Sequence, residues 1–328
     1  MRRAVCFLTL ALGCTGEPSD APSGVEPAIP LRTPVKVALN WFPEPEFGGF
    51  YEGVLGGHYE RAGLDVEIIP GGPSAPTLEL LGSGRAQVAI TAADDLLLKR
   101  SKGIKAVGAW PAFQLSPLGL MVHEETGPAG FAEIASQAEP RVAIEVGGPF
   151  QTFLWKRFGW EGVVQAVPYG GSVGPFLVDP DFVQQAYVTS EPCVARAKGA
   201  RVRFLRSSDA GWNHYGTLVA FSDPPPVWAA DFVAATQAAW EAYLASPARA
   251  NAEIGRLNDQ LTPELLDCVT ESQRPFVTGE DGLGAMRAER WAATAAALVE
   301  VGLLPEGSTG DGAWVELRGA PPAGSASR

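Results

Sequence analysis

The chain has 328 residues, of which 46% are hydrophobic and 19% are charged, a composition typical of a globular protein with one large or two ordinary domains. Its 25 lysines and arginines stand against 37 acidic residues, and the net charge of −12 excludes a general attraction to nucleic acid or anionic lipid. The mean hydropathy is +0.04, and no apolar run reaches the roughly 18 residues of a membrane span, which excludes a multi-span membrane protein.

The N-terminus has the layout of an export signal. Arg2 and Arg3 precede a short apolar stretch that ends in small residues before Cys14, which predicts a signal peptide over residues 1–13. The run ALGC before and at this cysteine resembles a bacterial lipobox, although Ala11 stands where leucine is usual. We therefore expect a lipid-anchored Cys14, with a plainly cleaved signal as the alternative.

Residues 14–34 are rich in Gly, Pro, Ser and Ala and predict a flexible tether. Beyond the tether only Cys193 and Cys268 remain, which is too few for a disulfide framework. The three histidines share no metal-ligand spacing, so no metal site is expected.

The folded body begins with alternating strands and helices. Strands are predicted over 35–39, 64–69, 86–90 and 104–109, and helices over 50–62, 77–82 and 94–102. A second block repeats the pattern, with strands over 141–145, 163–167, 186–188 and 201–205 and a helix over 150–158. The last third is mainly helical, over 229–245, 263–271 and 286–301, before a disordered tail at 318–328. The alternation predicts an α/β fold with parallel sheets.

One stretch is far more specific than this pattern. The segment LNWFPEPEFGGFYEGVLGGHYERAGLDVEIIPGG, residues 39–72, resembles the opening of the family that includes bacterial thiamine-pyrimidine binding proteins and the fungal pyrimidine synthase. Shorter stretches at 82–90, 99–104, 189–192 and 197–200 are similar to the same family and occur in the same order. The resemblance covers residues 35–304.

This resemblance implies a periplasmic-binding-protein fold of type II, in which two α/β domains flank a ligand cleft and close about a hinge. The first domain would combine residues 35–122 and 214–317, and residues 123–213 would form the inserted second domain. A bond between Cys193 and Cys268 would then staple the two domains and oppose opening, so we expect two free thiols.

Ligands of open α/β sheets bind at the carboxyl ends of the strands. The loops at these positions, together with the resemblance, predict a set of ligand-binding residues: Asn40, Trp41, Glu44, Phe47, Tyr51, Ser74, Thr91, Asp95, Trp110, Gln114, Gly148, Tyr169, Ser190, Glu191 and Trp212.

Within this set, Trp41 is the expected stacking face for a planar ligand, whereas Phe42 and Tyr51 are alternatively core residues. Asp94 is expected to cap a helix, which leaves Asp95 as the ligand-facing carboxylate. Glu191 precedes a proline, which would prevent a regular element there and turn the carboxylate into the cleft.

The enzymatic branch of the resembled family consumes its own pyridoxal phosphate, and it needs a lysine, a histidine four places on and a cysteine-rich run. Thr91, Asp95 and the segment around His214 occupy the corresponding positions here, and threonine cannot form a Schiff base. We therefore expect a binding protein without a cofactor, with an exported enzyme of the synthase type as the alternative.

The resemblance implies a monomeric, extracytoplasmic substrate-binding protein that works with the permease and ATPase subunits of an ABC importer. The expected ligand is a planar heterocycle: a thiamine-pyrimidine precursor first, a riboflavin-like ring next, and a sulfonate or nitrate last, since the loops named above contain no Arg or Lys.

Overall fold

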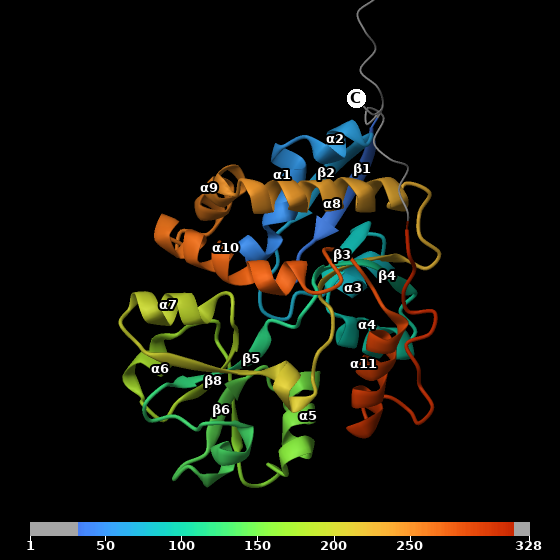
Figure 1. Cartoon of the computed structure of the whole chain (residues 1–328). Coiled ribbons are helices and arrows are strands. Elements are labelled where there is room, and N and C mark those ends of the chain that lie inside the picture. The colour runs from blue at the N-terminus through green and yellow to red at the C-terminus, as the bar shows by residue number, and fades with distance from the viewer. Residues whose placement is uncertain (1–31, 318–328) are drawn as a thin grey trace, which may run out of the picture. The chain divides into compact units, whose positions relative to one another are not determined.

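The computed structural model describes residues 32–317, which belong to one compact unit. The chain forms two lobes, each built on a five-stranded sheet. In Figure 1 one lobe contains the labels β1 to β4 and the other contains β5, β6 and β8. The first sheet has the order β2-β1-β3-β10-β4, with β1 (Thr33–Ala38), β2 (Leu64–Ile69), β3 (Val88–Thr91), β4 (Ala106–Phe113) and β10 (Gly216–Ser222). The second has the order β7-β6-β8-β5-β9, with β5 (Leu118–His123), β6 (Arg141–Ile144), β7 (Gln165–Pro168), β8 (Val183–Tyr187) and β9 (Val202–Arg206).

The sheets are mixed rather than parallel. In the first sheet β10 pairs antiparallel with β3 and β4, and in the second β5 pairs antiparallel with β8 and β9. Strands β5 and β10 were not among the predicted strands. Five of the six residues of β5 and six of the seven of β10 are buried, so neither strand shows the alternation that marks a half-exposed strand.

The chain passes between the lobes twice, and the expected boundary at residue 122 is wrong. Strand β5 lies in the second sheet, so the first passage runs between Phe113 and Leu118; the second runs between β9 and β10. Asn213 ties the two passages together, because its Oδ1 accepts the Ser116 backbone N–H at 3.1 Å and also a hydrogen bond from Arg290 at 2.7 Å. These contacts define the hinge of the molecule.

Helices cover both faces of the first sheet. On one face the apolar core contains Trp240 and Tyr243 and is formed by η1 (Pro45–Phe47), α1 (Gly48–Leu55), α2 (His58–Arg61), α8 (Ala229–Ala245), α9 (Ala248–Leu257) and α10 (Pro263–Thr278). The other face is covered by α3 (Thr77–Gly82), α4 (Ala93–Ser101) and α11 (Ala288–Glu300), and this core continues into the second lobe.

The second sheet carries α5 (Pro149–Phe158), α6 (Gly174–Val178) and α7 (Glu191–Ala197), with short 3-10 turns η2 (Phe131–Ser136) and η3 (Ser207–Ala210). Helix α7 begins at Glu191 with Pro192 in its first turn, where proline is tolerated, so the expectation that this proline prevents a regular element is wrong. The helix expected over 50–62 is also interrupted, because Gly57 adopts a left-handed φ of 68° between α1 and α2.

The prediction of two free thiols is wrong as well. Cys193 of α7 and Cys268 of α10 form a disulfide, with a Cα–Cα distance of 6.1 Å. Figure 1 shows the reason, since α7 of the second lobe lies directly beneath α10 of the first. The disulfide between the two lobes, which we expected to be absent, is therefore present.

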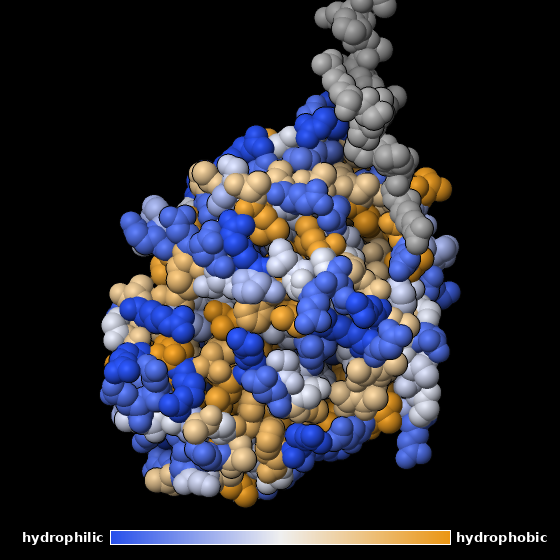
Figure 2. All heavy atoms as spheres, in the orientation of Figure 1, coloured by the Kyte–Doolittle hydropathy of each residue, from blue (hydrophilic) through white to orange (hydrophobic). Residues whose placement is uncertain are grey.

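None of the helices in residues 32–317 is long and apolar enough to cross a membrane. On the face shown in Figure 2, hydrophilic side chains cover much of both lobes, and the apolar ones lie in scattered groups between them. The expected signal peptide, Cys14, the tether up to residue 31 and the tail at 318–328 lie outside the described residues.

Candidate functional site

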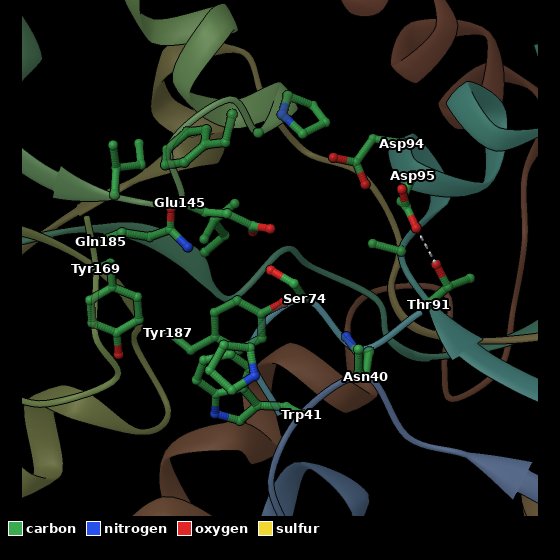
Figure 3. Close-up of a pocket in the computed structure, with 18 of the residues that line it drawn as sticks. Asn40, Trp41, Ser74, Thr91, Asp94, Asp95, Glu145, Tyr169, Gln185 and Tyr187 are labelled. Atoms are coloured by element: carbon green, nitrogen blue, oxygen red, sulfur yellow. Dashed lines mark hydrogen bonds between the residues drawn. The ribbon is translucent and has the colours of Figure 1, made fainter. Parts of the chain in front are cut away.

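A pocket of about 670 Å³ lies between the lobes (Figure 3). Its walls are the loops that follow the carboxyl ends of β1, β2 and β3 in the first lobe and of β6, β7 and β8 in the second. Because β1, β2 and β3 run parallel, as do β6, β7 and β8, their ends converge on one opening. The fold thus places side chains from both lobes around one cavity.

Backbone packing positions Trp41 at this opening. Gly71 donates its N–H to the Trp41 carbonyl at 3.0 Å, and a Cβ at Gly71 would lie 2.1 Å from the Leu39 carbonyl oxygen. Only glycine allows this approach of the loops after β1 and β2. The indole also reaches the second lobe, since a Cβ built on Gly171 would lie 3.6 Å from it.

Three carboxylates gather at the Trp41 end of the pocket, from Glu44, Glu46 and Glu191. Ser190 Oγ donates to Glu44 Oε2 at 2.8 Å, which joins the two lobes. Glu191 accepts hydrogen bonds from the Tyr169 hydroxyl and, at 2.8 Å, from the Tyr187 backbone N–H.

Burial and the nearby Glu191 charge raise the pKa of Glu44 to about 7, although hydrogen bonds from Ser190 and Trp41 oppose the rise. Burial, followed by the charges of Glu44 and Glu191, also raises the pKa of Glu46 well above its ordinary value. A positively charged or proton-donating group bound here would relieve the repulsion among these carboxylates.

A second group of polar side chains lies at the other side of the pocket. Asp95 Oδ2 accepts a hydrogen bond from Thr91 Oγ1 at 3.2 Å, and burial followed by the Asp94 charge raises the pKa of Asp95 to about 6. Asp94 does not cap α4 as expected, because the N-cap is Ala92 and no side chain caps that end. Asp94 is instead 7% exposed and lines the pocket, 3.6 Å from His214 Nε2.

The pocket as a whole is strongly acidic. Among the lining residues are seven carboxylates: Glu44, Glu46, Glu79, Asp94, Asp95, Glu145 and Glu191. Lys99 is the single lysine or arginine among the lining residues, and it is ion-paired with Glu79. Burial lowers the pKa of His214, so this imidazole stays neutral at pH 7 and does not offset the charge.

Most of the predicted site residues do line this pocket. They are Asn40, Trp41, Glu44, Ser74, Thr91, Asp95, Gly148, Tyr169, Ser190 and Glu191. Figure 3 shows Asn40, Trp41 and Ser74 near one another. It also shows the hydrogen bond between Thr91 and Asp95, which belongs to α4.

Five predicted residues lie elsewhere. Phe47, Tyr51 and Trp110 are core residues of the first lobe, exposed by 0%, 5% and 3%, because they face the α8 side of the sheet. Gln114 is buried at the hinge, and Trp212 packs on Phe153 with ring centroids 4.8 Å apart. Phe42, for which a core position was one alternative, is 43% exposed and lies edge-on to Trp41.

Four further residues line the pocket without having been predicted as site residues: Glu46, Glu145, Gln185 and Tyr187. Tyr187 lies among carboxylates, since burial and then the charges of Glu46, Asp94, Glu145 and Glu191 raise the pKa of its phenol. The available signal was that Tyr187 lies within the short strand predicted over 186–188, directly before a loop that was already expected to face the cleft.

Solved structures with the same architecture identify the fold. The alkanesulfonate-binding protein SsuA from Xanthomonas axonopodis pv. citri, solved with MOPS bound, matches with a TM-score of 0.62 at 12% identity, over 87% of this chain and 98% of that one. The periplasmic aliphatic sulphonate binding protein SsuA from Escherichia coli matches with a TM-score of 0.62 at 15% identity, over 83% and 89%. The fold is thus that of periplasmic binding proteins, in the two-domain type II form, which confirms the expected fold class.

The sequence comparison is more specific. The chain belongs to the NMT1/THI5-like family, whose sequence model matches residues 44–250, more than half of its length. A curated relative, the formylaminopyrimidine-binding protein of Halalkalibacterium halodurans, is 27% identical over 194 residues. That match covers 58% of this chain and 58% of the relative's length.

Proposed function

We propose that the protein is the solute-binding component of an ABC importer and that it captures a planar heterocycle with amine or ring N–H groups, a thiamine-pyrimidine precursor first. The observation that carries the proposal is the Trp41 end of the pocket. There an aromatic face from one lobe meets a cluster of carboxylates contributed by both lobes. Aromatic stacking holds the ring, and carboxylates accept from its N–H edge.

The charge of the pocket argues against the ligands named for the structural neighbours. A sulfonate or nitrate needs cationic or neutral donors, whereas seven carboxylates line this pocket and the lining Lys99 is already paired with Glu79. Those neighbours share the fold at 12% and 15% identity, while the formylaminopyrimidine-binding relative shares 27%. A pyrimidine therefore agrees with both the charge and the relative.

A synthase-type enzyme is the alternative from another class. At the position of the expected cofactor lysine stands Thr91, whose hydroxyl is hydrogen-bonded to Asp95. Lys99 also lines the pocket, but its ammonium is held by Glu79. Both observations favour a binding protein, because Schiff-base formation needs a free amine.

In this proposal the protein is exported, monomeric and held at the membrane by lipid on Cys14, and it presents its closed form to the permease. Native mass spectrometry of protein purified from its host, followed by calorimetry against a pyrimidine precursor, riboflavin and an alkylsulfonate, tests the ligand class. Retention of a pyrimidine, or its preferred binding, supports the proposal. Preferred binding of the sulfonate, or turnover of the ligand to a product, contradicts it.

A further inference from the structure

Asp94 is a buried carboxylate without a matched partner. It is 7% exposed, and its Oδ1 accepts no hydrogen bond from the described residues. His214 Nε2 lies 3.6 Å from that oxygen, which is too far for a hydrogen bond. A buried carboxylate oxygen that accepts no hydrogen bond costs free energy, and a donor on a bound ligand would remove that cost.

His214, which faces Asp94, also has an unsatisfied buried polar atom. The imidazole is 4% exposed, lines the same pocket, and has no hydrogen-bond partner for Nδ1 among the described residues. Burial keeps the ring neutral, so one ring nitrogen is available as an acceptor. Buried polar atoms in folded proteins are nearly always satisfied, so Asp94 and the His214 imidazole are candidates to bind a polar group of a ligand.

The opposite lobe adds a second carboxylate here. Glu145 follows β6 and is exposed to the pocket. Its pKa is raised by partial burial and, to a smaller extent, by the negative charge of Asp94. Its loop is fixed by the Glu145 backbone N–H, which donates to Gln185 Oε1 at 3.2 Å. Figure 3 shows the Asp94 carboxylate pointing into the pocket from α4, whereas the carboxylate of Asp95, which also lines the pocket, points to Thr91.

We propose that Asp94, Glu145 and His214 form a second subsite of the pocket that binds a cationic primary amine on an arm of the ligand. An ammonium group has three N–H donors, which match two carboxylates and one imidazole nitrogen. The inference rests on the proposed function, since the ring of the same ligand would lie against Trp41, which Figure 3 shows well apart from Asp94. It deepens that function by naming the ligand class as a heterocycle with a cationic side arm.

The subsite also predicts which ligand charges the pocket favours. Glu44 and Glu191 face each other from the two lobes at one side, and Asp94 and Glu145 do so at the other. Like charges that face each other repel, and a ligand with donors at both ends would neutralise both pairs. A neutral arm would leave the second pair uncompensated.

The test compares ligands that differ only in the arm. One pair carries an aminomethyl or a hydroxymethyl group on a 4-amino-2-methylpyrimidine ring, and the other pair is benzylamine and benzyl alcohol. Calorimetry at pH 7 should show the wild type binding the ammonium member of each pair at least about tenfold more tightly. Asp94→Asn should lose about tenfold of that preference, and Glu145→Gln about threefold, because Glu145 is more exposed.

The control is Asp231→Asn, which removes one negative charge from an exposed position of α8 and should keep the preference. Thermal unfolding checks that each variant is folded. If Asp94→Asn does not fold, Glu145→Gln still tests the subsite. Equal binding of each pair by the wild type, or an unchanged preference in both variants, overturns the subsite and leaves the proposed function standing. Preference for benzylamine without binding of either pyrimidine supports the subsite and contradicts the proposed ring. Binding of neither pair contradicts both.

Discussion

The disulfide between Cys193 and Cys268 should contribute strongly to stability. It joins residues 75 apart in sequence, and it links helices α7 and α10 of different lobes. Cross-linking a loop of that length lowers the entropy of the unfolded chain and so stabilises the folded state by about 4.5 kcal/mol at 25 °C in the chain-entropy treatment. Removal of the bond should therefore lower Tm by about 7 °C, given the unfolding entropy expected for a folded region that spans residues 32–317.

The perturbation is the double variant Cys193→Ser/Cys268→Ser, compared with the wild type under oxidising conditions. Both proteins carry Cys14→Ser so that the N-terminal thiol does not contribute. Calorimetry measures Tm and urea denaturation measures the unfolding free energy, while thiol titration after unfolding counts free sulfhydryls. Reduction of the wild-type chain should reproduce the effect of the double variant.

A change in unfolding free energy below about 1 kcal/mol would refute the reasoning, and so would two titratable thiols in the oxidised protein. The bond also bears on motion, because disulfides hold their Cα atoms within about 7 Å and so keep α7 beside α10. Spin labels on these helices should therefore show a narrow distance distribution in the oxidised protein and a broader one after reduction.

Three further predictions concern the pocket and the anchor. Trp41→Ala should weaken binding of planar ligands by about 1–3 kcal/mol, whereas Glu191→Gln should weaken mainly those with an amine or ring N–H, as calorimetry can measure. The pKa of Glu44 rises from 4.5 to about 7, so folded protein keeps a proton that the unfolded chain releases. The contribution of Glu44 to the unfolding free energy should therefore fall by up to ~3 kcal/mol as pH rises from about 4.5 to 7, and Glu44→Gln should make the slope less steep in urea denaturation, with the other raised carboxylates leaving a remainder. Cys14→Ser should move the protein from the membrane fraction to the soluble fraction, as immunoblotting shows.

Each of these has a clear contrary result. Unchanged affinity of Trp41→Ala for aromatic ligands would remove the stacking face from the site. A wild-type unfolding free energy that is constant or rises between pH 5 and 8, or a slope that is as steep in Glu44→Gln as in the wild type, would contradict the assigned burial of that carboxylate. Membrane association that persists in Cys14→Ser would contradict lipid anchoring.

Local patterns in the sequence predicted many elements closely. The helix at 229–245 and the strand at 64–69 were predicted with the bounds that the structure has, because their apolar spacing and flanking glycines or prolines are local signals. The segment from Leu39 to Gly72 identified the family, and the rule for strand ends selected the right loops. Trp41, Glu44 and Glu191 were therefore found before any contact was known.

Only the tertiary structure decided which side chains of those loops face the cavity. Phe47 and Trp41 are six residues apart, yet packing against α8 and α10 buries one in the core and leaves the other at the pocket. Asp94 and Asp95 are neighbours on α4 and both line the pocket, but the helix turn of about 100° per residue directs Asp94 toward His214 and Asp95 toward Thr91. The Cys193–Cys268 bond depends on two helices that meet only when the lobes are assembled, and such a contact between distant segments leaves no mark in local sequence.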